Sequence, residues 1–220
     1  MLNRAQQFLT GLALSSLCML GFAAPANAAP VVAAEAPASA LEAFKARHNK
    51  VVELVKKRAE TAALQKEVDD LLDYKSLAES SLGGPARYAS KCEPRCAEFE
   101  TLLARLIREN YLKRIRTDKK YELTYVGETE KARSTHVITN VALSRDGKPE
   151  TVEVVYVMHQ VNGTWKCEDI ITDGVSLAKN YKFEFNKILK DKGINELISR
   201  LESKLNELAA RPTAVAAPKK

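Results

Sequence analysis

The sequence predicts an α+β fold in which several amphipathic helices pack on one face of a mostly antiparallel, four-stranded sheet. Apolar residues recur every three or four positions as far as about residue 115. They alternate with polar residues between about 121 and 172, and the helical spacing returns after Gly174. Strand-period segments joined by short turns form antiparallel hairpins. Helices and strands that are segregated along the chain are typical of an α+β domain.

The composition limits the number of domains and the class of protein. The chain has 220 residues, 45% of them hydrophobic, which suits one compact domain with a small appendage and excludes a mainly disordered protein. The formal net charge of +6 is spread among acidic residues and does not indicate nucleic-acid binding. The densest basic segment, KRIRTDKK at 113–120, is interpreted as a solvated helix end, with attraction to an anionic surface as the alternative.

Both ends of the chain differ in composition from its middle. Residues 1–28 are typical of a secretory signal peptide, with Arg4, an apolar run over 9–22 and a small-residue cleavage site at Ala26-Asn27-Ala28. Residues 29–40 are predicted to be a flexible leader rich in Ala and Pro, and residues 209–220 a disordered tail. We therefore expect an exported, soluble and unanchored protein whose folded domain spans 41–208.

Four helices are predicted before the strands. The first covers about 41–63, because its apolar residues form one stripe, and a short second helix follows it. Asp73 is a suitable N-cap for the third, which runs from Tyr74 to Leu82 and is ended by Gly83-Gly84-Pro85. Pro94 suits the first turn of the long fourth helix. The buried side of that helix is predicted to consist of Phe99, Leu102, Leu103, Leu106, Ile107 and Tyr111.

The four predicted strands are separated by turn signals. Asp146-Gly147 and Asn162-Gly163 are typical of tight hairpin turns. The helical period after Gly174 predicts further helix up to about Leu208. The apolar phase of the strands comprises Tyr121, Leu123 and Tyr125, then Val137, Val141 and Leu143, then Val152, Val154, Tyr156 and Met158.

Three cysteines remain beyond the predicted signal peptide. Cys92 and Cys96 are predicted to be disulfide partners because they are close in the chain, and unpaired packing is the alternative. The histidines are scattered at His48, His136 and His159, so no metal site is expected. No cofactor fingerprint is present in the sequence.

No catalytic constellation emerges from the sequence. Asp173-Gly174-Val175-Ser176 lacks the second glycine of a nucleophile elbow. Ser176 is interpreted as a cap near a helix N-terminus. Asp169 and Asp173 lie four residues apart on a strand, about 13 Å from each other, which is too far to share a proton. We interpret both as structural caps.

The segment WKCEDIITDGVSL, from Trp165 to Leu177, resembles the MlaC family, also called toluene-tolerance proteins. The resemblance extends over about 41–208 and includes Asp73-Tyr74. This sequence departs from the family at Glu168, where an aromatic residue is common, and in the insert from Cys92 to Cys96. Further matching residues are Leu77-Ala78, Leu82-Gly83, Phe99, Leu103, Tyr111, Asn180-Tyr181, Phe185-Asn186-Lys187-Ile188-Leu189 and Lys192-Gly193-Ile194-Asn195-Glu196-Leu197.

The resemblance implies a periplasmic lipid carrier and no enzymatic activity. Members of this family bind phospholipid in a deep apolar pocket between helices and sheet, with the headgroup outside. They exchange it with an outer-membrane lipoprotein complex and with an inner-membrane ABC transporter that carries an MCE-type subunit, which maintains outer-membrane lipid asymmetry. Related members are associated with hopanoids, so a carrier of another lipid is an alternative.

The pocket lining is predicted from the inward phase of the strands and the facing helix. A slip of one residue would exchange the two faces of the sheet as a block. The predicted lipid-binding residues are Val137, Val141, Val154, Tyr156 and Met158 on the sheet, Leu103, Leu106 and Tyr111 opposite them, and Leu77 and Leu82 nearer the rim.

Two other classes of protein fit a similar fold. An enzyme of the ketosteroid-isomerase type would need an Asp or His inside the apolar pocket, and His136 and His159 fall on the polar phase of their strands. A protein-binding module would instead expose an apolar groove to a polypeptide.

Overall fold

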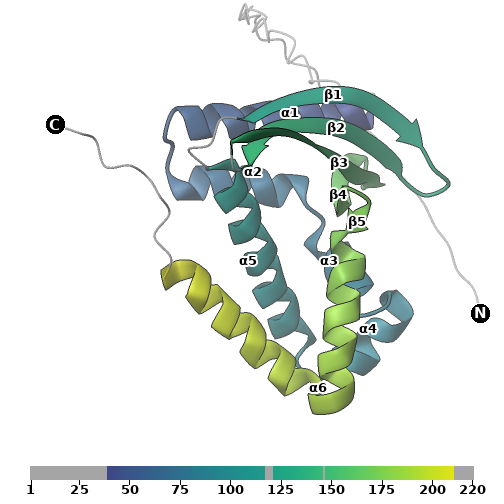
Figure 1. The fold of residues 1–220 in the computed structure, drawn as a ribbon. Coiled ribbons are helices and arrows are strands. Elements are labelled where there is room, and N and C mark those ends of the chain that lie inside the picture. The colour runs from purple at the N-terminus through teal and green to yellow at the C-terminus, as the bar shows by residue number, and fades with distance from the viewer. Residues whose placement is uncertain (1–38, 117–120, 146, 211–220) are drawn as a thin grey trace, which may run out of the picture. The chain divides into compact units, whose positions relative to one another are not determined.

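The computed structural model describes residues 39–116, 121–145 and 147–210 (Figure 1). The predicted signal peptide at 1–28, nearly all of the leader and most of the tail lie outside the described residues. Within the described ranges the chain forms helices, then a sheet, then a long kinked helix, so the predicted α+β class is confirmed. None of the described helices is long and apolar enough to cross a bilayer.

Five helices precede the sheet: α1 (Ala40–Lys56), α2 (Thr61–Leu71), α3 (Tyr74–Ser81), α4 (Pro85–Cys92) and α5 (Cys96–Ile115). The helix predicted over 41–63 is in fact divided between α1 and α2. Arg58 adopts a positive φ of 51°, and the N–H of Ala59 donates to the carbonyl of Leu54, which ends α1 in a left-handed turn. Asp73 caps α3 as predicted, because its carboxylate accepts from the N–H of Ser76.

The helix α4 was not predicted. Pro85 occupies its first turn, where the missing N–H costs nothing, so the residue begins a helix as well as ending the previous one. The sequence predicted that Pro94 lies in the first turn of α5, and this is wrong. Arg95 is the N-cap and the helix begins at Cys96, so Pro94 precedes the helix. A disulfide joins Cys92 to Cys96 and ties the end of α4 to the start of α5.

The sheet is an antiparallel meander of five strands in the order β1-β2-β3-β4-β5. The short fifth strand was not predicted. Asn162 and Gly163 both have positive φ, as a tight hairpin turn between β3 and β4 requires. The strands are β1 (Tyr121–Glu130), β2 (Thr135–Arg145), β3 (Lys148–Val161), β4 (Thr164–Thr172) and β5 (Val175–Ser176).

The last helix, α6 (Leu177–Ala210), changes direction at Gly193, whose φ of 76° is not helical. Figure 1 shows α5 between the two arms of α6 on the helical side of the sheet. The N-terminus of α6 is capped as predicted for Ser176, whose hydroxyl accepts from the N–H of Lys179. Asp169 adds a second cap by accepting from the N–H of Ala178.

The packed core lies between the helices and one end of the sheet face. Val137 and Met158 on the sheet and Phe99 on α5 have no exposed surface. Helices α3 and α6 both pack on β4 in this region. The same face of the sheet continues beyond this core toward the end of α5, where it borders a cavity.

Candidate functional site

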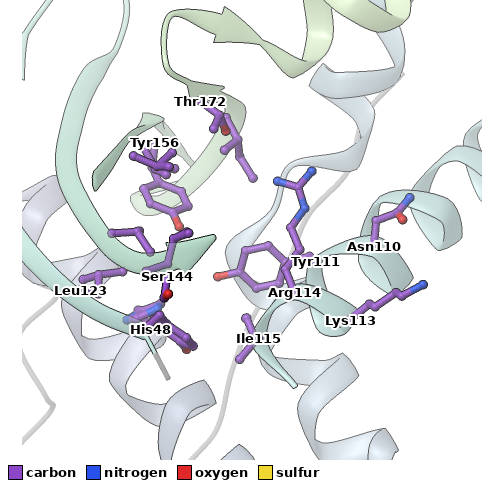
Figure 2. A pocket seen from close by; sticks show the side chains of 16 residues that line it. His48, Asn110, Tyr111, Lys113, Arg114, Ile115, Leu123, Ser144, Tyr156 and Thr172 are labelled. Atoms are coloured by element: carbon purple, nitrogen blue, oxygen red, sulfur yellow. The ribbon is translucent and has the colours of Figure 1, made fainter. Parts of the chain in front are cut away.

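A cavity of about 670 Å³ lies between the sheet and the last turns of α5 (Figure 2). This volume is in the range of about 300–1,000 Å³ that small-molecule sites occupy. The residues that line it are His48 of α1; Asn110, Tyr111, Lys113, Arg114 and Ile115 of α5; and Tyr121, Leu123, Val141, Leu143, Ser144, Val152, Val154, Tyr156, Ile170 and Thr172 of the sheet.

The sheet wall of the cavity follows from strand register. Val141 lies opposite Val152, and Leu123 lies opposite Val141 on the other side. Residues paired across antiparallel strands point to the same face, so these apolar side chains form a continuous row. Farther along the same face, the paired residues are Val154 with Thr172 and Tyr156 with Ile170.

The opposite wall follows from helical spacing. Tyr111, Arg114 and Ile115 are three and four residues apart, so α5 presents them on one side. Ile115 is buried, whereas Lys113 and Arg114 are exposed. The cavity therefore has an apolar interior and reaches the surface at the basic C-terminal end of α5.

His48 is the histidine of the cavity, and it is held uncharged. Burial lowers its pKa to about 4. Its Nδ1 lies 2.9 Å from the hydroxyl of Tyr125, which itself donates to Asn49. The hydroxyl has a single proton, so it accepts from Nδ1–H, and this assigns the proton of the neutral ring to Nδ1.

Two phenols enclose the deep part of the cavity. Burial raises the pKa of Tyr111 and of Tyr156 well above the usual value, so both remain protonated donors at physiological pH. Figure 2 shows Tyr111 with its hydroxyl directed from α5 toward the side of the sheet. The Oη atom of Tyr111 is buried and has no hydrogen-bond partner among the residues that the structure describes.

The structure brings four of the ten predicted lining residues together at the cavity: Tyr111, Val141, Val154 and Tyr156. The other six are nearly or fully buried in the packed core and do not border the cavity. Their sheet members occupy the same face, but at the end that α3 and α6 cover. These six residues are Leu77, Leu82, Leu103, Leu106, Val137 and Met158.

Sequence reasoning missed most of the polar lining. His48 was considered as one of three scattered histidines, and Arg114 was part of the predicted solvated helix end. Leu143 and Val152 could have been included, since each lies two residues from a predicted lining residue on the same strand. Asn110 and Ser144 have no signal in the sequence that distinguishes them from other surface residues.

The remaining candidates have structural partners. The second carboxylate oxygen of Asp169 accepts from the hydroxyl of Ser176, so the two side chains belong to the cap of α6. Asp173 is not a helix cap; its carboxylate accepts from the N–H of Glu153 and ties the end of β4 to β3. The Nε2 atom of His159 lies 2.9 Å from Oδ2 of Asp73, and His159 does not line the cavity. No cluster of potential metal ligands occurs in the described part of the chain.

Comparison with known proteins gives a family and a fold. The family model described as MlaC protein matches residues 40–203. A solved structure, a phospholipid-binding protein from Ralstonia solanacearum in complex with a phospholipid, superposes with a TM-score of 0.63 at 20% identity. The match covers 78% of this chain and 99% of that chain, and it shows that the two share a fold. The curated proteins contain no match.

Proposed function

The chain belongs to the MlaC family, and from this membership together with the cavity we propose that it is a periplasmic lipid carrier. It binds the acyl chains of a phospholipid in the cavity and releases the lipid to partner proteins. No covalent bond is made or broken in this function.

The cavity is the observation that carries the proposal. Its walls are mostly apolar, and it reaches the surface at the end of α5. Each CH₂ group transferred out of water gains about 0.8 kcal/mol, so a long acyl chain resists crossing an aqueous compartment by on the order of 10 kcal/mol. A carrier must recover most of that free energy by burying the chain, and an apolar cavity can do so.

The ligand class is proposed from the similar solved structure. The Ralstonia solanacearum protein has the same fold and was solved with a phospholipid. Phospholipid is therefore the first ligand to test here. Tyr111, Val141, Val154 and Tyr156 are the sequence-predicted residues that we propose contact it.

The partners and compartment are proposed from the family. We expect exchange with an outer-membrane lipoprotein complex and with an inner-membrane ABC transporter that carries an MCE-type subunit. The signal-like composition of residues 1–28 supports export to the periplasm. Release requires that a partner open the cavity, because a lipid held by burial alone dissociates slowly.

The enzyme alternative is less favoured by the chemistry of the cavity. A general base works best when its pKa is near the working pH. His48 lies inside the cavity, but burial lowers its pKa to about 4, which makes it a weak base. His136 and His159, the residues considered from the sequence, do not line the cavity.

The test is the lipid content of the exported protein. Native mass spectrometry followed by solvent extraction should find phospholipid at near-equal stoichiometry in the wild type. Val154→Glu places a carboxylate in the apolar cavity and should abolish co-purified lipid while the protein remains folded. Val126→Glu is the matched control, because Val126 is 56% exposed and does not line the cavity. A normal lipid load in Val154→Glu would contradict the proposed site.

A further inference from the structure

We propose that Tyr111 and Arg114 form a polar clamp on α5 that binds the ester and phosphate oxygens of the lipid and so fixes its orientation in the cavity. This inference rests on the proposed function. It adds a hydrogen-bonded recognition of the polar part of the ligand to a site whose other walls are mostly apolar.

The clamp is built by a single turn of helix. Tyr111 and Arg114 are three residues apart on α5, so both side chains leave the helix on the side of the cavity. Arg114 is exposed at the mouth, and the Oη of Tyr111 is buried deeper. Figure 2 shows the two side chains next to each other between α5 and the sheet.

Tyr111 supplies a donor that lacks an acceptor. Its Oη atom is buried and has no partner within the described ranges, and Figure 2 shows the hydroxyl directed from α5 toward the sheet. Buried polar groups in proteins are nearly always hydrogen-bonded, and leaving one unpaired is costly. Because burial keeps the phenol protonated, the missing partner must accept a hydrogen bond. An ester carbonyl or a phosphate oxygen of a lipid can do this, whereas a pure hydrocarbon cannot.

Arg114 supplies a cation at the same site. Its charge opposes the effect of burial on the pKa of Tyr156, so the guanidinium acts on that buried phenol from the mouth. No carboxylate of the described residues forms a salt bridge with it. A guanidinium presents several donors in a planar fork that matches a phosphate group. Lys113, also part of the lining, adds a second positive charge at the mouth.

Tyr111 and Arg114 together fix the orientation of the bound lipid. The phosphate lies at the mouth beside Arg114, the ester-linked glycerol lies at the depth of Tyr111, and the acyl chains extend along the aliphatic row of the sheet. A lipid inserted headgroup-first would bury its charged phosphate away from Arg114, which is costly.

The experiment compares two probes on the delipidated full chain. Phosphatidylglycerol carries the acceptor oxygens, and diphenylhexatriene is a hydrocarbon without any. Tyr111→Phe removes one hydroxyl, and we expect it to weaken phosphatidylglycerol binding about tenfold while diphenylhexatriene binding is unchanged. Arg114→Gln should show the same selective loss, and Arg114→Lys should recover part of it. Tyr181→Phe is the matched control, because Tyr181 is half-buried on α6 and does not line the cavity.

The possible outcomes separate the inference from the function on which it rests. If the wild type binds neither probe, the proposed lipid-carrier function fails. If the wild type binds both and the Tyr111 and Arg114 variants bind phosphatidylglycerol normally, the clamp is overturned and the carrier function stands. Equal loss of both probes in Tyr111→Phe also overturns it, since the residue then only shapes the cavity. A diether phosphatidylglycerol, which lacks ester carbonyls but keeps the phosphate, identifies the acceptor. If Tyr111 donates to an ester carbonyl, Tyr111→Phe should not weaken binding of the diether lipid. If Tyr111 donates to the phosphate, the loss of binding should persist.

Discussion

His48 is a polar side chain that lies in a mostly apolar interior. Its ring stacks on Phe44 at 5.5 Å between centroids, and its Nδ1–H donates to Tyr125. The residue is only 5% exposed, so a charge on it would be desolvated without a carboxylate among its described hydrogen-bond partners. The fold therefore accepts His48 only in its neutral form.

The pH dependence of stability follows from this. The pKa of His48 is about 4 in the folded protein and about 6.5 in the unfolded chain, so between these values only the unfolded state binds the proton. The free energy of unfolding should therefore fall as the pH decreases through this window, by roughly 2–3 kcal/mol between pH 7 and pH 4.5. Urea unfolding at the two pH values measures it.

His48→Gln is the control for that measurement. Glutamine can still bond to Tyr125 but does not titrate, so the variant should lose less stability than the wild type over the same interval. Carboxylates that titrate near pH 4.5 affect both proteins equally and cancel in the comparison. Identical pH dependence in the two proteins would show that His48 is not the group responsible.

Residue roles that depend on local sequence could be predicted, and those that depend on distant contacts could not. Asp73 and Ser176 each cap a helix that begins at the next residue. Their position just before a helical spacing of apolar residues is therefore sufficient to predict the capping role. The unpaired hydroxyl of Tyr111 has no such signal. It is defined by the absence of an acceptor among the described residues, most of which lie far from Tyr111 in the chain.

At the scale of elements, the inward face of β2 and β3 has two different environments. Val137 pairs with Tyr156 near the covered end, and Val141 pairs with Val152 beside the cavity. Alternation places all of them on one face, but it contains no information about which stretch the helices cover. That depends on where α5 ends and where α6 bends, and these are tertiary features. The prediction of ten lining residues therefore mixed core with cavity.

Truncation of one residue in each environment should separate them. Leu103→Ala in the packed core should lower the free energy of unfolding by about 2–5 kcal/mol, because Leu103 has no exposed surface. Val141→Ala should cost about 1 kcal/mol or less, because the side chain is only partly buried and already lacks neighbours on its cavity side. Urea unfolding of the two delipidated variants gives the comparison. Equal losses would mean that Val141 is packed as tightly as Leu103 and does not border an open cavity.

At the scale of the whole described molecule, part of the interior is a cavity in place of packed side chains. A packed interior gains dispersion contacts and removes apolar surface from water, whereas an empty cavity does neither. Under the proposed function, the protein forgoes stability in its delipidated state and regains it when hydrocarbon fills the space. Binding and folding are consequently linked through the occupancy of one cavity.

The consequence can be measured as a ligand-dependent stability. A ligand that binds only the folded state adds RT ln(1 + [L]/Kd), about 2.7 kcal/mol when its free concentration is a hundred times Kd. Delipidated wild type should thus unfold at lower urea or lower temperature than the lipid-loaded protein, and added short-chain phosphatidylglycerol should restore the difference. Val154→Glu should show no such gain, whereas Val126→Glu should respond like the wild type. A wild-type protein that is equally stable with and without phospholipid would contradict a function based on filling this cavity, because tight occupancy of a folded-state site must raise stability.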